Sequence, residues 1–341
     1  MRPFLFDEPT ILFYNIPIRN KEGAMKAKRN KTIDLSVADG AEYLARCISA
    51  TAPAALPEVL DKTLLGNTFD LLPFLPPQSV DLLIVDPPYN LDKDFHGSAF
   101  KKTSDEAYAE FTERWVSAAK PLLKPSASIY VCCDWQSSSA IYSVLQRHFH
   151  IQNRITWQRE KGRGAKNNWK NGMEDIWFAT VGKDYIFHVD AVMQRRKVIA
   201  PYRVEGQPKD WEETTDGNFR NTHPSNFWDD ISIPYWSMPE NTAHPTQKPE
   251  KLLAKLILAS SNPGDVVLDP FAGSGSTAVT AKKLGRHYIG IEQNKQYCVW
   301  AEKRLEMADT DTSIQGYADG VFWERNTAAA QKKARKQEST D

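Results

Sequence analysis

The chain has 341 residues, 41% of them hydrophobic, which is enough for one large elaborated domain or for two domains. Lys plus Arg and Asp plus Glu both number 43, so the net charge is zero and composition alone does not indicate a nucleic-acid partner. The four cysteines lack Cys-x-x-Cys spacing and the seven histidines do not cluster with them, so no metal site is expected. No apolar run reaches the roughly 18 residues of a membrane span. No secretion signal is recognisable either, and these features predict a soluble, cytoplasmic protein.

Regular secondary structure is predicted from residue 63 onward, where apolar strands alternate with amphipathic helices. Residues 1–60 show no such pattern and are interpreted as an N-terminal extension of a folded domain at 61–308. The predicted strands are 63–66, 80–85, 128–133, 151–158, 175–180, 266–269 and 287–292. The predicted helices are 105–120, 249–260, 276–284 and 295–307. This alternation predicts an α/β fold with helices on both faces of a parallel or mixed sheet.

Two stretches depart from the alternation. Residues 191–243 are rich in Pro, Asn, Asp and Trp without a sustained period, so they are interpreted as an irregular insertion carried on the sheet. Residues 309–341 are polar and are predicted to form a solvated tail. Between residues 151 and 210, twelve Lys and Arg residues exceed seven Asp and Glu residues, an excess of five. A phosphate-facing surface and an ordinary solvated face explain that excess about equally well.

The end of the predicted strand 80–85 carries the first chemical motif, Asp86-Pro87-Pro88-Tyr89. An exocyclic amine on adenine or cytosine is a poor nucleophile because its lone pair is delocalised into the ring. The Asp86 carboxylate can accept one amino hydrogen and the Pro87 carbonyl the other, which favours a pyramidal nitrogen, while the Tyr89 ring can stack on the base. A duplex hides these atoms, so the base has to be flipped out.

The second motif follows the predicted strand 266–269 and runs from Asp269 through Phe271, Gly273 and Gly275 to Thr277. Its Gly-x-Gly-x-x-Ala spacing predicts a nucleoside cofactor against a parallel sheet, with Glu292 after the next strand as the ribose-binding acid. The glycine turn alone permits NAD, FAD or S-adenosylmethionine. The Asp269 carboxylate favours the last of these, because it repels a pyrophosphate and suits a cationic amino group and sulfonium.

Together the two motifs resemble those of the S-adenosylmethionine-dependent DNA amino-methyltransferases. Asp86-Pro87-Pro88-Tyr89 precedes Asp269-Pro270-Phe271-Ala272-Gly273-Ser274-Gly275, which is the order found in their β-ordered group. His244-Pro245-Thr246-Gln247-Lys248-Pro249 is similar to that family's segment ahead of the cofactor strand. The resemblance covers residues 63–307 and implies a Rossmann-like methyltransferase fold, a mixed twisted sheet with an inserted target-recognition region at 191–243.

The resemblance also implies roles for individual residues. Asp86, Pro87, Pro88 and Tyr89 bind and orient the target amine. The cofactor contacts are Asp269, Phe271, Gly273, Gly275, Thr277 and Glu292, with His244 and Thr246 on the cofactor's far side. The family often has Gly-Asp before the catalytic strand, where this chain has Gly66-Asn67. Asn67 keeps an acceptor oxygen for the cofactor adenine but not the charge.

Contacts to DNA are predicted in two regions. The stretch 159–170 is basic and contains glycines, and we interpret it as a DNA-facing loop in which Arg163, Lys166, Asn168 and Trp169 grip phosphates or fill the gap left by the flipped base. Within the insertion the candidates are Trp211, Arg220, Asn226, Trp228 and Trp236, for which loop packing is an equally good explanation. Double-stranded DNA is thus the expected partner. A cognate restriction endonuclease and a second copy of the chain remain open, since dimers are common in the family.

The sequence thus predicts methylation of adenine N6 in a short DNA sequence, with S-adenosylmethionine as cofactor. Within the family an Asp at the head of the first motif more often accompanies adenine N6, and a Ser cytosine N4; cytosine N4 therefore stays open. Cytosine C5 chemistry is excluded because neither Cys132 nor Cys133 follows a Pro in a loop. Two alternatives of other classes are a nucleotide-dependent oxidoreductase and a noncatalytic DNA-binding module. The first leaves Asp86 to Tyr89 unexplained, and the second predicts a broken motif.

Overall fold

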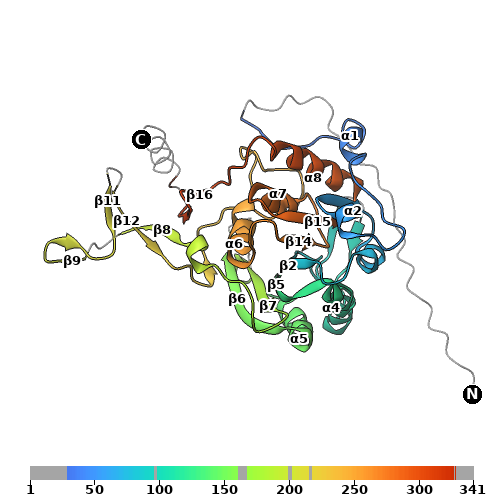
Figure 1. Cartoon of the computed structure of the whole chain (residues 1–341), viewed down its shortest axis with the longest axis horizontal. Coiled ribbons are helices and arrows are strands. Elements are labelled where there is room, and N and C mark those ends of the chain that lie inside the picture. Colours follow the sequence, from blue (N-terminus) through green and yellow to red (C-terminus); the bar gives the residue numbers. More distant parts are fainter. Residues whose placement is uncertain are drawn as a thin grey trace, which may run out of the picture.

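A computed structural model describes residues 29–95, 98–159, 167–198, 202–214, 217–325 and 327. Its centre is an eight-stranded sheet in the order β1-β15-β14-β2-β5-β7-β6-β13 (Figure 1). In that order, the strands are Lys62–Leu65, His287–Glu292, Val266–Asp269, Val80–Val85, Leu123–Cys133, Met173–Thr180, His150–Gln158 and Phe227–Trp228. β7 runs antiparallel to both of its neighbours and the other pairs are parallel, so the sheet is mixed as predicted.

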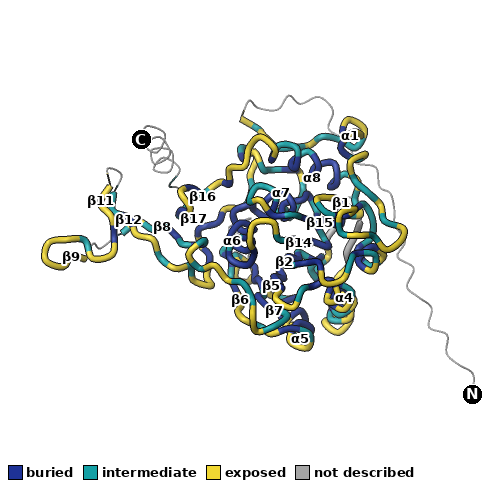
Figure 2. Tube along the Cα trace, viewed as in Figure 1, coloured by how far each residue is buried: buried dark blue, intermediate teal, exposed yellow. Residues whose placement is uncertain are grey.

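Strand β2 shows why the sheet is covered on both faces. It is apolar at nearly every position, as expected for a strand buried on two sides. Leu83 and Val85 point into one core, with α4 (Asp105–Ala119) and α5 (Ser138–His148). Leu82 and Ile84 point into the other, with α6 (Glu250–Ser260) and α7 (Ser276–Lys283). Figure 2 shows these buried strands at the centre of the body.

The predicted helices are present, and their ends have local causes. The Ser104 hydroxyl accepts a hydrogen bond from the Ala107 amide and so caps α4, and Asn294 caps α8 (Lys295–Met307) in the same way. Gly285 follows α7 with a φ of 71°, the left-handed conformation typical of a glycine just after a helix. Helix α5 was not predicted. The remaining short helices are α1 Ala41–Leu44, α2 Leu56–Val59, α3 Thr68–Leu71, and the 3₁₀ turns Leu72–Phe74, Lys120–Leu122 and Val189–Val192.

The insertion is more regular than predicted, which corrects the irregular interpretation of 191–243. A second, five-stranded sheet has the order β11-β12-β8-β17-β16, and β9 and β10 form a separate hairpin. Figure 1 shows β9, β11 and β12 in an arm that extends away from the body. In chain order, the strands are β8 Gln194–Lys197, β9 Arg203–Val204, β10 Gln207–Pro208, β11 Glu212–Thr214, β12 Gly217–Thr222, β16 Tyr317–Ala318 and β17 Val321–Trp323. A further hairpin joins β3 Lys93–Phe95 to β4 Ser98–Phe100.

Two predicted boundaries also shift. Residues 317–323, assigned from the sequence to the polar tail, pair through β17 with β8 and so complete the second sheet. Phe322 is fully buried there, which a solvated tail does not explain. The described part of the N-terminal extension lies against α8, where Tyr43 packs with Tyr297 and Trp300. None of the helices in the described ranges is long and apolar enough to cross a membrane.

Candidate active site

The two motifs meet at the carboxyl edge of the sheet. β2 and β14 are adjacent and parallel, with Leu82 opposite Val267 and Leu83 opposite Leu268, so Asp86 and Asp269 emerge at the same edge. The chain runs from β14 to β15 on one side, while the neighbour of β2 on the other side is β5. This divergence creates the crevice in which open α/β sheets bind their ligands. The two motifs therefore converge in space, as a joint action on one substrate requires.

The Asp86 carboxylate is held on one oxygen and open on the other. Its Oδ1 accepts hydrogen bonds from Lys248 Nζ at 2.6 Å and from the Tyr89 hydroxyl at 2.9 Å. Lys248 Nζ also donates to the Tyr89 oxygen at 3.1 Å, which closes a triangle of contacts. Among the described residues none donates to Asp86 Oδ2. That oxygen is therefore the acceptor available to a ligand.

Of the two proline carbonyls that follow Asp86, one accepts a hydrogen bond within the protein and the other is open. The Tyr108 hydroxyl donates to the Pro88 carbonyl at 2.9 Å, whereas no group in the described ranges donates to the Pro87 carbonyl. Asn90 anchors the segment from behind, because its side chain accepts from the Thr103 amide at 2.7 Å and donates to the Thr103 carbonyl at 3.0 Å. The strand end thus presents two acceptors, Asp86 Oδ2 and the Pro87 oxygen, on a fixed support.

Lys248 and Glu174 belong to this site and were missed in the sequence. Lys248 lies in the segment 244–249, and its ammonium is 3.4 Å from Glu174 Oε2 on β7. The Arg159 guanidinium pairs with the other Glu174 oxygen. Burial alone lowers the pKa of Lys248, but the carboxylates of Asp86 and Glu174 outweigh it and raise that pKa, so the ammonium stays charged. In the sequence, Lys248 lies inside the segment 244–249, which was singled out for His244 and Thr246 and not for its lysine.

The glycine turn is built around the Asp269 carboxylate. Its oxygens accept from the Phe271 amide at 3.0 Å and from the Thr277 hydroxyl at 2.6 Å. Gly275 has a φ of 75°, and a Cβ there would lie 2.6 Å from the Ala301 Cβ, so only glycine fits between the turn and α8. Burial raises the pKa of Asp269 to about 7, and the neighbouring Asp86 adds to the increase.

Glu292 closes the opposite side of the turn. Its carboxylate accepts from the Gly273 amide at 2.8 Å and from the Asn294 amide at 2.7 Å. Burial raises its pKa to about 7, and the charge of Asp269 contributes further. Two carboxyl groups whose ionisation is disfavoured, the buried Asp269 and the partly buried Glu292, therefore flank the same turn. A ligand that is cationic or rich in hydroxyl donors relieves this cost.

The remaining predicted cofactor residues surround this turn. His244 Nε2 lies 3.1 Å from the position of a Cβ on Gly273, and its ring packs edge-on against Tyr297. The Thr246 amide donates to His244 Nδ1 at 3.3 Å, which places Thr246 beside the same ring. Phe271 packs edge-on against Trp115 of α4. Asn67 uses its Oδ1 to accept from the Phe69 amide and cap α3, a local role that the sequence interpretation did not anticipate.

The predicted DNA contacts have mixed outcomes. Arg163 and Lys166 lie outside the described residues, whereas Asn168 is exposed and Trp169 is 94% exposed. Arg220 is exposed and lies 3.5 Å from Asp210. The prediction that Trp228 contacts DNA is corrected. Trp228 is only 7% exposed, and the Lys255 ammonium lies over its ring at 4.8 Å, so the ring packs within the protein. Of the other insertion candidates, Trp211 is buried, the Asn226 amide donates to the Arg154 carbonyl, and Trp236 is half exposed.

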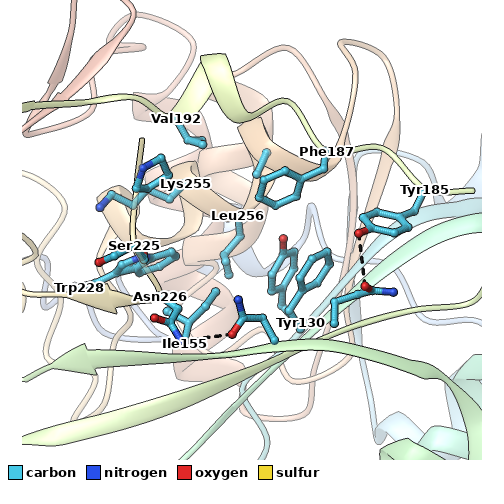
Figure 3. Close-up of a pocket in the computed structure, with 15 residues that line it drawn as sticks. Tyr130, Ile155, Tyr185, Phe187, Val192, Ser225, Asn226, Trp228, Lys255 and Leu256 are labelled. Atoms are coloured by element: carbon cyan, nitrogen blue, oxygen red, sulfur yellow. Dashed lines mark hydrogen bonds between the residues drawn. The ribbon is translucent and has the colours of Figure 1, made fainter. Parts of the chain in front are cut away.

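A separate cavity of about 260 Å³ lies on the α6 face of the sheet (Figure 3). The stacked rings of Tyr130 and Phe178 form part of its wall. Its polar lining includes Gln152, near the start of β6, whereas the end of β6 points toward the Asp86 edge. None of the residues predicted for catalysis or cofactor binding lines it, so this cavity is not the active site.

Comparisons with known proteins agree with the geometry of the site. A family model for N6 and N4 enzymes, described as DNA methylase, matches residues 80–303. The chain is 35% identical to the type II methyltransferase M.HpaI of Haemophilus parainfluenzae over 71% of this chain and 73% of that protein. It is 34% identical to the DNA adenine methyltransferase YhdJ of Escherichia coli strain K12, over 71% of this chain and 82% of that protein.

The fold has solved counterparts as well. Protein TTHA0409 of Thermus thermophilus, described as a putative DNA modification methylase and solved with S-adenosyl-L-methionine, superposes with a TM-score of 0.50 at 20% identity. The superposition covers 77% of this chain and 98% of that one. The chain therefore belongs to the DNA methylase family, which confirms the resemblance inferred from its motifs.

Proposed function

We propose that the protein transfers a methyl group from S-adenosylmethionine to N6 of an adenine flipped out of duplex DNA. The observation that carries this proposal is the pair of open acceptors, Asp86 Oδ2 and the Pro87 carbonyl, at the sheet edge that also holds the acidic glycine turn. An exocyclic amine has two hydrogens to donate to such a pair. The relative named as an adenine methyltransferase supports adenine as the base.

The residues around Gly273 fit S-adenosylmethionine. Asp269 suits a cationic group, and Glu292 suits the two hydroxyls of a ribose because two backbone amides hold its carboxylate in place. His244 lies next to the Gly273 backbone and limits the space on that side. Bound there, the cofactor supplies an electrophilic methyl group on a positively charged sulfur.

The chain's own residues prepare the nucleophile. Asp86 and the Pro87 carbonyl each accept one hydrogen from N6, which draws the nitrogen lone pair out of the ring and toward the methyl group. When bound, the cofactor would supply the methyl group to N6 and would keep the electron pair of the broken S–C bond on its sulfur. The Asp86 carboxylate, which accepts one N6 hydrogen, would take up the proton that N6 loses. These residues thus act by orientation and electrostatics without a covalent intermediate.

The DNA interface that we propose is the edge carrying Trp169 and Asn168 together with Arg220 on the arm. Trp169 is fully available for stacking, which suits it to the space left by a flipped base. Arg159, at the base of that loop, is engaged by Glu174 and is not free to bind phosphate. The arm widens the surface that a duplex can contact.

Cytosine N4 is the second candidate, because its amine presents the same two hydrogens to Asp86 and Pro87. The oxidoreductase alternative has no support in the site, since a pyrophosphate would meet the carboxylate of Asp269. A noncatalytic module is disfavoured because both motifs are intact and correctly placed. We further propose action in the cytoplasm on double-stranded DNA, with a cognate restriction endonuclease and a homodimer as partners to be sought.

The proposal is tested by incubating the purified protein with labelled S-adenosylmethionine and adenine-containing duplex DNA, then identifying the modified nucleoside by mass spectrometry. N6-methyladenine is expected from the wild type and from Asp319→Asn, a change at an exposed turn where Asn tolerates the left-handed backbone. Asp86→Ala should form less than about one hundredth as much. N4-methylcytosine as the product would transfer the proposal to the second candidate.

A further inference from the structure

The catalytic carboxylate is part of a group of four charges, of which the middle two, Lys248 and Glu174, are buried. The four groups follow one another with alternating sign: Asp86 just after β2, Lys248 from the segment 244–249, Glu174 on β7, and Arg159 just after β6. The side chains of Lys248 and Glu174 are 7% and 4% exposed, so neither relies on water for its partner. Two positive and two negative charges balance. Removing any one of them leaves an unpaired charge in a poorly solvated place.

Of these four residues, Glu174 has no role so far in binding the amine or the cofactor. It lies on the strand next to β5, one position before Asp175, which pairs with Cys133. Its Oε2 is 3.4 Å from both the Lys248 ammonium and the Tyr89 hydroxyl, so two groups that hold Asp86 also face Glu174. A buried acid directed at both holders of the catalytic carboxylate is more than a local packing contact.

We infer that Glu174 and Lys248 are positioning residues for methyl transfer. Lys248 fixes Asp86 Oδ1, so that Oδ2 faces the target amine. Glu174 draws the ammonium of Lys248 partly away from Asp86. The inference rests on the proposed function and adds two residues that neither motif predicts. Its physical basis is the sharing of one cation between two carboxylates. An ammonium bound to Asp86 alone would make that carboxylate a weaker acceptor for the amine.

Removal of each charge has a different consequence. In Glu174→Gln, Lys248 keeps only Asp86 as a charged partner, so kcat should fall about tenfold or more with an unchanged pH profile. In Lys248→Met, Asp86 and Glu174 repel one another with no ammonium between them, and kcat should fall about 100-fold. The rising limb of its pH profile should also move to higher pH. The other titratable groups facing this site are Tyr89, Cys132, Cys133 and Asp269.

The double variant Lys248→Met/Glu174→Gln separates positioning from general loss of packing. It removes one charge of each sign, so Asp86 and Arg159 remain balanced and the pH profile should return toward that of the wild type. Its kcat should exceed that of Lys248→Met by about tenfold. Lys248→Arg retains the charge and should recover a measurable part of the activity with an unshifted profile.

The measurement is single-turnover methyl transfer between pH 6 and 9, together with the dissociation constants of S-adenosylmethionine and of duplex DNA carrying 2-aminopurine at the target. Both dissociation constants should stay within about threefold of wild type in every variant. A Glu174→Gln enzyme with unchanged kcat would overturn the inference. So would a loss of cofactor affinity as large as the loss of kcat, because Lys248 and Glu174 would then be cofactor ligands.

Folding and the proposed function are controlled separately. Circular dichroism should show native structure for all variants, and if Glu174→Gln fails to fold, the charge-balanced double variant decides by its kcat and pH profile. A double variant no more active than Lys248→Met, at the same shifted pH, would contradict the sharing of one cation. If the wild type itself transfers no methyl group, the proposed function fails, an outcome distinct from any difference between variants.

Discussion

The affinity for S-adenosylmethionine should depend strongly on pH between 6 and 8, because the two carboxyl groups that we propose as its ligands titrate in this range. The pKa values of Asp269 and Glu292 are both raised to about 7, chiefly by burial. Each group is then about 10% ionised at pH 6 and about 90% ionised at pH 8. Only the ionised carboxylates attract the cationic amino group and accept from the ribose hydroxyls at full strength.

The size of the effect follows from these fractions. If binding takes both groups in their ionised form, about 0.8% of the protein is competent at pH 6 and about 83% at pH 8, so the dissociation constant should rise up to about 100-fold on acidification. Below pH 6 its logarithm should change by about two for each pH unit. Protons should be released on binding, up to nearly two per cofactor at pH 6.

Isothermal titration calorimetry in buffers of different ionisation enthalpy measures both quantities. Glu292→Gln should reduce the slope from about two to about one, although its affinity is lower throughout. Glu113→Gln is the matched control, because its Arg147 partner already lowers the pKa of Glu113 to about 2 and the group lies away from the crevice. A dissociation constant that is the same at pH 6 and pH 8 would refute the assignment of these acids to the cofactor.

Three further outcomes are expected. Gly275→Ala should lose roughly 2 to 5 kcal/mol of unfolding free energy in a urea titration, because of left-handed backbone strain and the clash with Ala301. Gly264→Ala is the control: its φ is 83° but no atom lies within 4 Å of the added Cβ, so it should lose about 1 to 2 kcal/mol. The cofactor-free protein should become less stable to urea as pH rises from 5 to 8, since native Asp269 and Glu292 retain protons that the unfolded chain has released. Stability that rises over this range would contradict the raised pKa values of these two groups. Trp169→Ala should leave stability unchanged but weaken 2-aminopurine fluorescence on binding duplex DNA, and an unaltered signal would remove Trp169 from the interface.

The central sheet was predictable because its signals are local. β2 and β14 are apolar runs that each end in an acid and a turn, and the helices α4 and α6 carry apolar residues at helical spacing. Glycines at 275 and 285 report positive φ directly. Because parallel strands present their carboxyl ends at one edge of a sheet, the two motifs then lie at the same edge.

The contacts around Asp86 were not predictable in the same way. Lys248 is 162 positions from Asp86, and Glu174 is 85 positions from Tyr89, so no spacing rule connects them. The strands of the insertion escape prediction because β9, β10 and β13 have two residues each and depend on distant partners. The pairing of β17 with β8 is also long-range in sequence, and it gives a strand to part of the stretch 309–341 that was predicted to be a polar tail.

The central claim is that Asp86 and the glycine turn act together on an amine in DNA. Sequencing genomic DNA with a readout of modified bases, from a methylation-free host that expresses this chain, tests it most directly. We expect N6-methyladenine at a fixed position within a recurring short sequence, and its disappearance with Asp86→Ala. Unmodified DNA from the wild-type strain, or modification that persists in the Asp86→Ala strain, would contradict the claim.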